Sequence, residues 1–312
     1  MNPVSVIIVS WNARGYLHDC LVSVREMGVA MVGQVIVVDN ASNDGSPEMV
    51  AQDFPEVELI QTGANLGFAR ANNIGLKRAS GSYVALINSD VIVHEKCIER
   101  LAEFLDHNPS VGLVGPKILS GDGHVQPSCR RLPTLWNTTC RALALDGFLS
   151  QRPWFSRQAL RDSDPKAAAV MEALSGCFWL ARREAVAQVG GLDERFFFYA
   201  EDLDWCKRMR DAGWQVAYVP EASATHFGGG SSGKAPLRYS IEMLRANLIY
   251  WRKHYGRPGQ TFFYLLSVLH HALRLIARGS KQLFGNDSSG ENAYKRMRSF
   301  ICLRWLLTGK EA

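Results

Sequence analysis

Short, strongly hydrophobic runs alternate with longer amphipathic stretches over roughly the first third of the chain. The runs are rich in valine and isoleucine, as is typical of strands buried on both faces, and they lie at Val4–Ser10, Gln34–Asn40, Val57–Thr62 and Ser82–Asn88. Helical patterns fall between and after them, near residues 14–27, 46–53, 66–79 and 95–107. This alternation predicts a three-layer α/β fold built on a parallel sheet.

The rhythm changes from residue 116 onwards. Residues 116–129 (PKILSGDGHVQPSC) predict a hairpin with its turn at Gly121–Gly123. Ser175–Ala181 predicts a further strand that leads into a helix, whereas residues 134–170 predict a mixture of helix and loop. Beyond Ser232 the pattern is helical, basic and aromatic.

Polar residues stand where two of the predicted strands stop. Asp39 and Asn40 end the second strand, and Asn88, Ser89 and Asp90 follow the fourth. Ligands of parallel α/β sheets gather at the carboxyl ends of the strands, so these side chains are candidates for a binding site. Asp90 has a second interpretation, as the N-cap of the helix expected after it.

The segment Val37–Ser46 (VVDNASNDGS) places two carboxylates beyond a strand end. Asp39 and Asp44 have the acceptors that a nucleobase imide and a ribose hydroxyl require. The same segment also suits a turn and a helix start, because asparagine, aspartate, glycine and serine are favoured there. Both interpretations stay open at this stage.

The segment Thr62–Leu76 (TGANLGFARANNIGL) gathers asparagine and glycine around a strand-to-helix turn. Asn72 lies inside the helical pattern, where asparagine is a mediocre helix former, so either its side chain has a role or it faces solvent. The turn has neither the GxGxxG pattern of dinucleotide-binding folds nor a GxxxxGK[ST] phosphate loop, which argues against dehydrogenases and P-loop enzymes.

The tripeptide Asn88–Asp90 (NSD) is similar to the acidic DxD element that holds a divalent metal against a diphosphate. Carboxylate oxygens are the ligands that Mg²⁺ and Mn²⁺ prefer. Asn88 takes the place of the first aspartate, so one anionic ligand of the full element is missing.

The segment Phe196–Met209 (FFFYAEDLDWCKRM) leads four aromatic residues into Glu201, Asp202 and Asp204 at the start of a predicted helix. Acidic residues in a first turn suit the helix dipole, which is a purely structural explanation. An acidic cluster beside aromatic rings also yields a partly desolvated carboxylate, whose raised pKa suits a general base.

His226 precedes a glycine-rich stretch that ends at Ser232 (GGGSS). A single histidine is more often structural than a ligand, but a flexible stretch next to it is typical of lids that close over substrates. His226 is therefore a candidate metal ligand.

Charge is distributed unevenly over the 312 residues, whose formal net charge is +5. Residues 1–230 carry 21 basic and 26 acidic residues, whereas residues 231–312 carry 14 basic and 4 acidic residues. A basic C-terminal region indicates an anionic partner such as phospholipid, and nucleic acid is disfavoured because no nucleic-acid-binding module accompanies the charge.

Three further features concern cellular setting. The seven cysteines are scattered without a CxxC pair, so reduced thiols in a cytosolic protein are expected. The first residues have no basic segment, so no signal peptide is expected. The most apolar stretch, Thr261–Gly279, is interrupted by His270, His271 and Arg274 and does not predict a membrane span.

Taken together and in this order, the motifs resemble the family 2 glycosyltransferases of GT-A fold, and within them the rhamnosyltransferase-like branch that builds polysaccharide and O-antigen chains. The resemblance covers roughly residues 3–232. It implies a Rossmann-like, three-layer mixed sheet in a catalytic domain at residues 1–232. Residues 233–312 would form a helical appendage that lies on a membrane surface, covers the sheet or forms a homodimer.

The resemblance also implies a role for each matching residue. Asp39 would bind the imide of uracil or thymine, and Asp202, in a pair with Glu201, would be the general base. Asp90 and His226 would hold Mg²⁺ or Mn²⁺. The remaining donor-binding residues would be Asn40, Asp44, Asn65, Gly67, Asn72, Asn88 and Ser89.

The implied activity is inverting transfer of a sugar, such as L-rhamnose, from a dTDP- or UDP-linked donor. The acceptor would be a glycan or a polyprenyl-diphosphate-linked glycan, with the enzyme peripheral at the cytoplasmic face of the membrane. Three alternatives stay open: a UDP-hexose-dependent transferase, a nucleotidyltransferase, and a non-catalytic sugar-nucleotide-binding protein. The nucleotidyltransferase is disfavoured, because the residues after the first strand (SWNARGYL) lack a basic, glycine-rich triphosphate loop.

Overall fold

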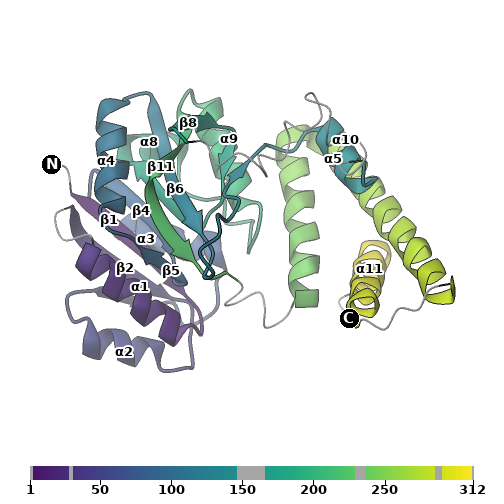
Figure 1. The fold of residues 1–312 in the computed structure, drawn as a ribbon, viewed down its shortest axis with the longest axis horizontal. Coiled ribbons are helices and arrows are strands. Elements are labelled where there is room, and N and C mark those ends of the chain that lie inside the picture. The colour runs from purple at the N-terminus through teal and green to yellow at the C-terminus, as the bar shows by residue number, and fades with distance from the viewer. Residues whose placement is uncertain (1–2, 28–30, 146–165, 229–235, 285–289, 311–312) are drawn as a thin grey trace. The chain divides into compact units, whose positions relative to one another are not determined.

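The computed structural model describes residues 3–27, 31–145, 166–228, 236–284 and 290–310. The chain divides into two compact units (Figure 1). An α/β unit comprises Met1–Leu132 and Ala159–Lys234, and a helical unit comprises Pro133–Gln158 and Ala235–Ala312. The expected boundary near residue 232 is close to the second division, but Pro133–Gln158 belongs with the helical unit.

The first half of the α/β unit is a parallel sheet in the order β3-β2-β1-β4. Its strands are β1 (Val4–Ser10), β2 (Val32–Asp39), β3 (Glu58–Gln61) and β4 (Tyr83–Asn88). The helices between and after them are α1 (Arg14–Met27), α2 (Ser46–Asp53), α3 (Phe68–Arg78) and α4 (Cys97–His107). These elements confirm the strands and helices that hydrophobic periodicity predicts for this part of the chain.

The second half makes the sheet mixed, and the parallel pairing that the early alternation predicts is found among the first four strands. Strand β10 (Phe178–Arg182) lies antiparallel between β4 and β6 (Val111–Leu119). The Asn88 amide donates to the Cys177 carbonyl at 2.9 Å, so β10 begins beside the carboxyl end of β4. The chain therefore enters β10 from the opposite end to its neighbours, which makes this strand antiparallel.

The remaining strands complete that half. Strand β11 (Gln215–His226) pairs parallel with β6, and β5 (Val91–Val93) and β8 (Ala169–Met171) pair antiparallel with β11. A separate two-stranded sheet joins β7 (Cys129–Arg130) to β9 (Ala173–Leu174).

Two helices and one hairpin complete the α/β unit. Helices α8 (Arg183–Val189) and α9 (Glu201–Asp211) follow β10. The expected hairpin is present as a short antiparallel contact between Leu119 and Val125.

Helices pack on both faces of the sheet and form three layers. Successive residues of β1 alternate between two cores, since Val6 and Ile8 join one and Ile7 joins the other. The first core also contains side chains of α1, α2 and α4, and the second contains side chains of α3, α8 and α9. Burial on both faces explains why the strands are continuously hydrophobic.

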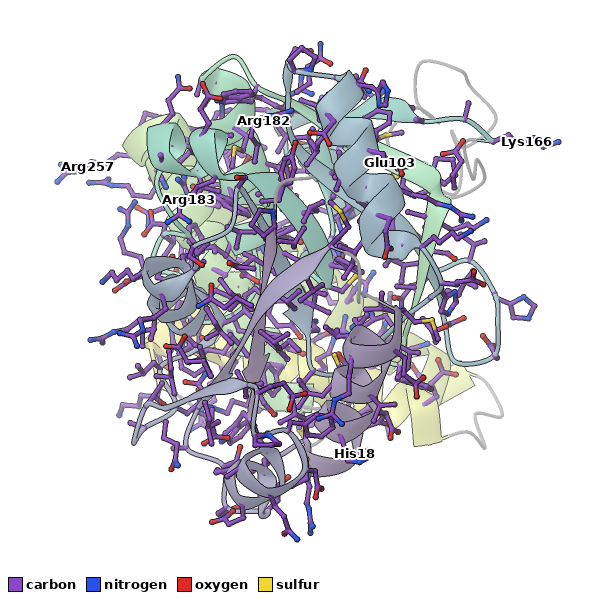
Figure 2. The ribbon with its side chains drawn as sticks, turned by 90° about the vertical axis from the view of Figure 1, so that its left-hand side faces the viewer. His18, Glu103, Lys166, Arg182, Arg183 and Arg257 are labelled. Carbon is purple, nitrogen blue, oxygen red and sulfur yellow. The ribbon has the colours of Figure 1, made fainter. Side chains whose placement is uncertain are left out.

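Two arginines secure the start of α8 and are labelled in Figure 2. Arg182 donates from Nη2 to the Leu105 carbonyl at 2.6 Å, and Arg183 donates from Nη1 to the Gly81 carbonyl at 3.0 Å. Both lie where β10 ends, away from the carboxyl end of β4, because Arg182 pairs in register with Tyr83. These guanidinium groups thus stabilise the fold through backbone carbonyls and lie away from the strand ends at which ligands bind.

The helical unit contains α5 (Leu135–Ala142), α10 (Pro236–Phe284) and α11 (Gly290–Thr308). Thr134 and Asn137 form a capping box at the start of α5, in the stretch for which helix and loop were both expected. Helix α10 is broken at Gly256, whose φ of 69° is not helical, and Pro258 follows two residues later. Among the described residues, no helix is both long and apolar enough to cross a membrane.

Candidate active site

Four chain segments meet at the carboxyl end of β4. The turn Asn88–Asp90 is held to Cys177 through the Asn88 amide, and the Ser175 amide donates to the Ser128 carbonyl at 2.8 Å. Burial raises the pKa of the Cys177 thiol to about 12, and the opposing charges of Asp90 and Arg130 both reach it. Asp90 and Arg130 therefore both lie near the Cys177 thiol, and Asp202 joins them through its pair with Arg130 at 3.3 Å.

Asp90 is not a helix cap. It lies in the tight turn between β4 and β5, and α4 begins only at Cys97. The Asp90 carbonyl accepts from the Phe227 amide at 3.1 Å, and Val91 pairs in register with His226. The strand pairing thus brings the end of β11 alongside the turn, so the helix-cap interpretation is wrong.

Asp90 and His226, both expected as metal ligands, face each other. Asp90 Oδ1 lies 3.3 Å from His226 Nε2, and both side chains are largely buried. On its other side, His226 Nδ1 lies 2.7 Å from Gln126 Oε1. An amide oxygen only accepts, so His226 Nδ1 donates to Gln126, and Nε2 is the ring nitrogen that faces the Asp90 carboxylate.

Two electron-pair donors in this arrangement suit a cation or a shared proton. Gln126 gives the imidazole the orientation and tautomer that a metal-ligating histidine requires. Asn88 Oδ1 is also buried and has no hydrogen-bond partner among the described atoms. Within the part of the chain that the structure describes, no group of three His, Cys, Asp or Glu side chains converges, and Asp90 and His226 are a facing pair of such side chains.

A second polar position lies at the carboxyl ends of β1 and β2. Ser10 and Asp39 are register partners in the parallel sheet and both are almost fully buried. Asp39 Oδ2 accepts from the Ser42 amide at 3.0 Å, whereas Asp39 Oδ1 and Ser10 Oγ have no hydrogen-bond partner among the described atoms. Buried polar atoms are nearly always satisfied, so this pair suits a polar ligand.

Asn40 and Gly67 build the loop that borders this position. Asn40 donates from Nδ2 to the Gly67 carbonyl at 3.1 Å and accepts at Oδ1 from the Leu66 amide at 3.1 Å. Gly67 has a φ of 81°, and a Cβ there would lie 2.5 Å from the Phe197 carbonyl oxygen. The loop therefore needs glycine at this point, and the Asn40 amide holds the loop in place.

The other two asparagines of this motif have local partners. Asn65 is exposed and accepts from the Gly67 amide at 3.0 Å in an Asx turn. Asn72 is buried and donates from Nδ2 to the Phe68 carbonyl at 2.9 Å within α3. Of the two, Asn65 faces solvent, whereas Asn72 does not.

Asp44 organises the turn that precedes α2. One carboxylate oxygen accepts from the Arg14 amide at 2.9 Å, and the other accepts from the amide and hydroxyl of Ser46. Partial burial acts to raise the pKa of Asp44, but these hydrogen bonds outweigh it and lower the pKa below the ordinary value. The turn interpretation is supported here, and Asp44 binds the β1–α1 connection as well.

The acidic cluster lies in the first turn of α9, as expected, but its three carboxylates have different surroundings. Asp204 is fully buried and pairs with Arg208 at 2.8 Å, and Arg208 also donates to the Val189 and Gly191 carbonyls. Asp202 accepts from its neighbouring Leu203 amide at 2.8 Å and pairs with Arg130 at 3.3 Å. Asp202 is thus the carboxylate of the cluster that faces the region of Asp90.

Glu201 is buried beside Asp202, and its Oε2 has no hydrogen-bond partner among the described atoms. Burial, reinforced by the charge of Asp202, raises the pKa of Glu201 well above its ordinary value. A carboxyl group whose pKa is raised to about 8 holds its proton at neutral pH, so Glu201 is uncharged there.

Substitution Glu201→Gln should raise stability relative to the wild type as the pH increases. Above the ordinary glutamate pKa of 4.5 the unfolded chain releases this proton while the folded chain keeps it, so the wild type loses stability with rising pH. The free energy of unfolding of the wild type falls by about 1.4 kcal/mol per pH unit until the pH reaches the raised pKa. Glutamine has no proton to release, so the variant does not lose this stability. Thermal melts of both proteins across this pH range test the prediction, and a pH-independent difference in melting temperature would contradict it.

The chain reaches α9 through two consecutive left-handed residues. Tyr199 and Ala200 have φ values of 74° and 62°, which non-glycine residues rarely adopt. The Phe68 amide donates to the Phe197 carbonyl at 2.8 Å, and Asn73 exchanges hydrogen bonds with the backbone of Leu192. These contacts hold the strained approach in place, and with it the direction in which Glu201 and Asp202 point.

Three residues of this site were not singled out from the sequence. Arg130 follows the predicted hairpin, Gln126 lies inside it, and Ser10 ends the first strand. The only sequence signal for Arg130 is the adjacent basic pair Arg130–Arg131. The interaction with Asp202 depends on the β7–β9 pairing, which brings together residues far apart in the chain.

Comparison with known proteins identifies the family. Residues 5–190 match the family model described as Glycosyl transferase family 2. The chain is a family 2 glycosyltransferase. This glycosyltransferase is 34% identical over 256 residues to an N-acetylglucosaminyl-diphospho-decaprenol L-rhamnosyltransferase of Mycobacterium tuberculosis, with 78% of this chain and 82% of that protein covered. It is also 22% identical over 260 residues to a dTDP-rhamnosyl transferase of Shigella flexneri, covering 79% of this chain and 80% of that one.

Solved structures confirm the GT-A fold of this glycosyltransferase. A mannosyltransferase from Pyrobaculum calidifontis, in complex with GDP-Man and Mn²⁺, aligns with a TM-score of 0.60 at 18% identity, covering 99% of this chain and 88% of that one. GalNAc-T7 with UDP, GalNAc and Mn²⁺ aligns with a TM-score of 0.56 at 16% identity, covering 78% of this chain and 48% of that one. The expected mixed three-layer sheet with a C-terminal helical region is therefore confirmed.

Proposed function

We propose that this glycosyltransferase moves L-rhamnose, with inversion, from a dTDP-linked donor to a polyprenyl-diphosphate-linked sugar during cell-surface polysaccharide assembly. The observation that carries the proposal is the similarity, over most of both chains, to a rhamnosyltransferase named for a diphospho-decaprenol acceptor. The Shigella relative is named for a dTDP-rhamnosyl donor. Transfer of this kind places the enzyme at the cytoplasmic face of the membrane, and no nucleic acid takes part.

The nucleotide-sugar donor would bind at the carboxyl ends of β1, β2 and β4, a region that we call the donor pole. Asp39 Oδ1, which has no partner among the described atoms, would accept from the imide N–H that thymine and uracil share. Asp44 would lie near the nucleoside. The surrounding part of the pocket would be formed by Asn40, Asn65, Gly67 and Asn72. Thymine and uracil present the same imide, so this contact does not distinguish dTDP-linked from UDP-linked donors. UDP-linked donors are therefore the alternative, and a panel of donors distinguishes the two.

The diphosphate would lie at the turn Asn88–Asp90. Asp90 and His226 would hold Mg²⁺ or Mn²⁺, which when bound supplies positive charge to the departing nucleoside diphosphate. The paired geometry and the tautomer imposed by Gln126 fit such an ion. Asn88 and Ser89 would add uncharged polar groups beside the phosphate oxygens.

The acceptor pole would lie at the start of α9. Asp202 would take the proton from the attacking hydroxyl of the acceptor, and its bond to Arg130 would fix the carboxylate in position. Glu201, protonated because of its raised pKa, would leave Asp202 as the only base of the pair.

A transfer assay tests the proposal. The purified protein is mixed with a diphospholipid-linked N-acetylglucosamine, Mg²⁺ or Mn²⁺ and one donor at a time: dTDP-L-rhamnose, UDP-glucose or UDP-galactose. Mass spectrometry should show addition of one deoxyhexose from dTDP-L-rhamnose alone, and NMR should show the inverted anomeric configuration. Transfer from a UDP-hexose instead would replace the donor assignment, and nucleotide binding without any transfer would indicate a non-catalytic protein.

The glycine-rich stretch beyond Gly228, which suggested a lid from the sequence, lies outside the described residues. The proposal therefore assigns no role to it. His226 precedes that stretch and is the last residue of β11.

A further inference from the structure

A row of large aliphatic side chains lies uncovered along the second half of α10. Leu265, Leu269, Leu273 and Ile276 follow one another at intervals of four, four and three residues, so they share one face of the helix. All four are exposed, with Leu265 at 59% and Ile276 at 70% of full exposure. We call this row the α10 stripe. Single exposed aliphatic residues are ordinary on protein surfaces, but a continuous row of four marks a contact surface.

The opposite side of the same helix is already used within the helical unit. Tyr264 donates from its hydroxyl to the Leu306 carbonyl of α11 at 3.1 Å, and His270 Nδ1 lies 2.7 Å from the Ala142 carbonyl of α5. Ser267 and His271 are buried between these contacts. These contacts among the described residues of the helical unit do not use the α10 stripe, which is available to a partner.

Charge indicates the chemistry of that partner. From Arg257 to Phe284, α10 carries four basic residues and no acidic one. Arg257 extends away from the ribbon in Figure 2 and is exposed. Arg274 and Arg278 follow the buried His271 at helical spacing, so they lie across the helix from the α10 stripe, and cationic residues of interfacial helices lie on the face opposite the apolar one.

An anionic lipid surface fits this combination better than a second copy of the chain. Two copies meeting through the α10 stripe would bring together two helices of like charge without an acidic residue between Arg257 and Phe284 to compensate. Phospholipid headgroups supply the missing negative charge, and the acyl region accepts leucine and isoleucine. The helix would then lie in the plane of the headgroups and would not cross the bilayer, in keeping with its hydropathy.

We propose that the α10 stripe docks the protein on an anionic lipid bilayer, with Leu265, Leu269, Leu273 and Ile276 entering the headgroup–acyl boundary. This surface is distinct from the catalytic residues, and it involves only the helical unit. It requires no particular donor sugar or acceptor glycan.

Vesicle sedimentation of the full chain tests the proposal without donor or acceptor. The wild type should bind vesicles of phosphatidylcholine mixed with phosphatidylglycerol, bind pure phosphatidylcholine less, and lose affinity as salt is added. The double substitution Leu269→Glu and Ile276→Glu should weaken binding by about tenfold or more. Both positions are exposed, so the melting temperature should stay close to that of the wild type.

The control is Val170→Glu, which places one glutamate, against two in the double variant, at an aliphatic residue of the α/β unit that is 57% exposed. It should bind anionic vesicles like the wild type. The proposal is overturned if the wild type does not bind these vesicles, or if the double variant binds as tightly as the control. It is also overturned if light scattering shows a wild-type dimer that the double variant abolishes, because the stripe would then be an interface between copies. Vesicle binding and sugar transfer are measured separately, so either proposal can fail alone.

Discussion

Replacing Asp202 with asparagine should lower the turnover number by about 10²–10⁴-fold, the usual contribution of a general base. Asparagine keeps the size of the side chain and an oxygen that can accept from the Leu203 amide, but it cannot take a proton from the acceptor. Binding of the nucleotide should be unchanged, since Asp202 lies at the acceptor pole. Initial rates at saturating donor and acceptor measure the effect.

Asp211→Asn is the matched control for that experiment. Asp211 lies at the other end of α9, is exposed, and pairs with Lys207 at 2.9 Å. The control should keep wild-type turnover. If Asp202→Asn also stays within about threefold of the wild type, the base must be another residue, because a proton acceptor contributes far more than that.

Replacing Asp90 with asparagine should lower activity by more than about 100-fold, because it removes the carboxylate of the metal-binding pair that we propose with His226. Gln126→Leu should have a smaller effect, about 10–100-fold, since it removes only the group that orients the imidazole. Both losses should be larger at low metal concentration and partly recovered as Mn²⁺ is raised. Steady-state rates over a metal titration measure them.

Asp53→Asn serves as the control for the loss of a negative charge, since Asp53 is exposed at the end of α2. It should behave like the wild type at every metal concentration. An Asp90→Asn variant with the wild-type rate and the wild-type metal dependence would show that the diphosphate is bound elsewhere.

The hydrophobic pattern predicts the Rossmann-like half of the fold well. Val4–Ser10 has the same bounds in the structure as in the sequence prediction, because a strand buried on both faces is hydrophobic along nearly all of its length, with Ser5 as the exception inside it. The direction of β10 could not be predicted in this way. Whether a strand runs parallel or antiparallel depends on the end of the sheet from which the chain enters it. That end is set here by the hydrogen bond between Asn88 and Cys177, which are far apart in the sequence, so a local pattern does not predict it.

The candidate site likewise has residues that the sequence predicts and residues that it does not. Asp39, Asp90 and Asp202 stand at ends of elements that periodicity locates, so their approximate positions follow from the strand and helix boundaries. Arg130 and Gln126 belong to the hairpin region, where partners are chosen by tertiary packing. The raised pKa of Glu201 likewise depends on its burial and on the charge of Asp202, and the sequence does not reveal how deeply Glu201 is buried.

The most direct test of the central claim is a thermal-shift panel with dTDP, UDP, GDP and CDP, each with and without Mn²⁺, on the wild type and on Asp90→Asn. A ligand present at 100 times its dissociation constant should add about 2.7 kcal/mol of stability, which is readily measured. The account predicts a shift with dTDP or UDP that depends on Mn²⁺ in the wild type and loses that dependence in Asp90→Asn. An equal shift in both proteins, or none with any nucleotide, would contradict a metal-held nucleoside diphosphate at Asp90 and His226.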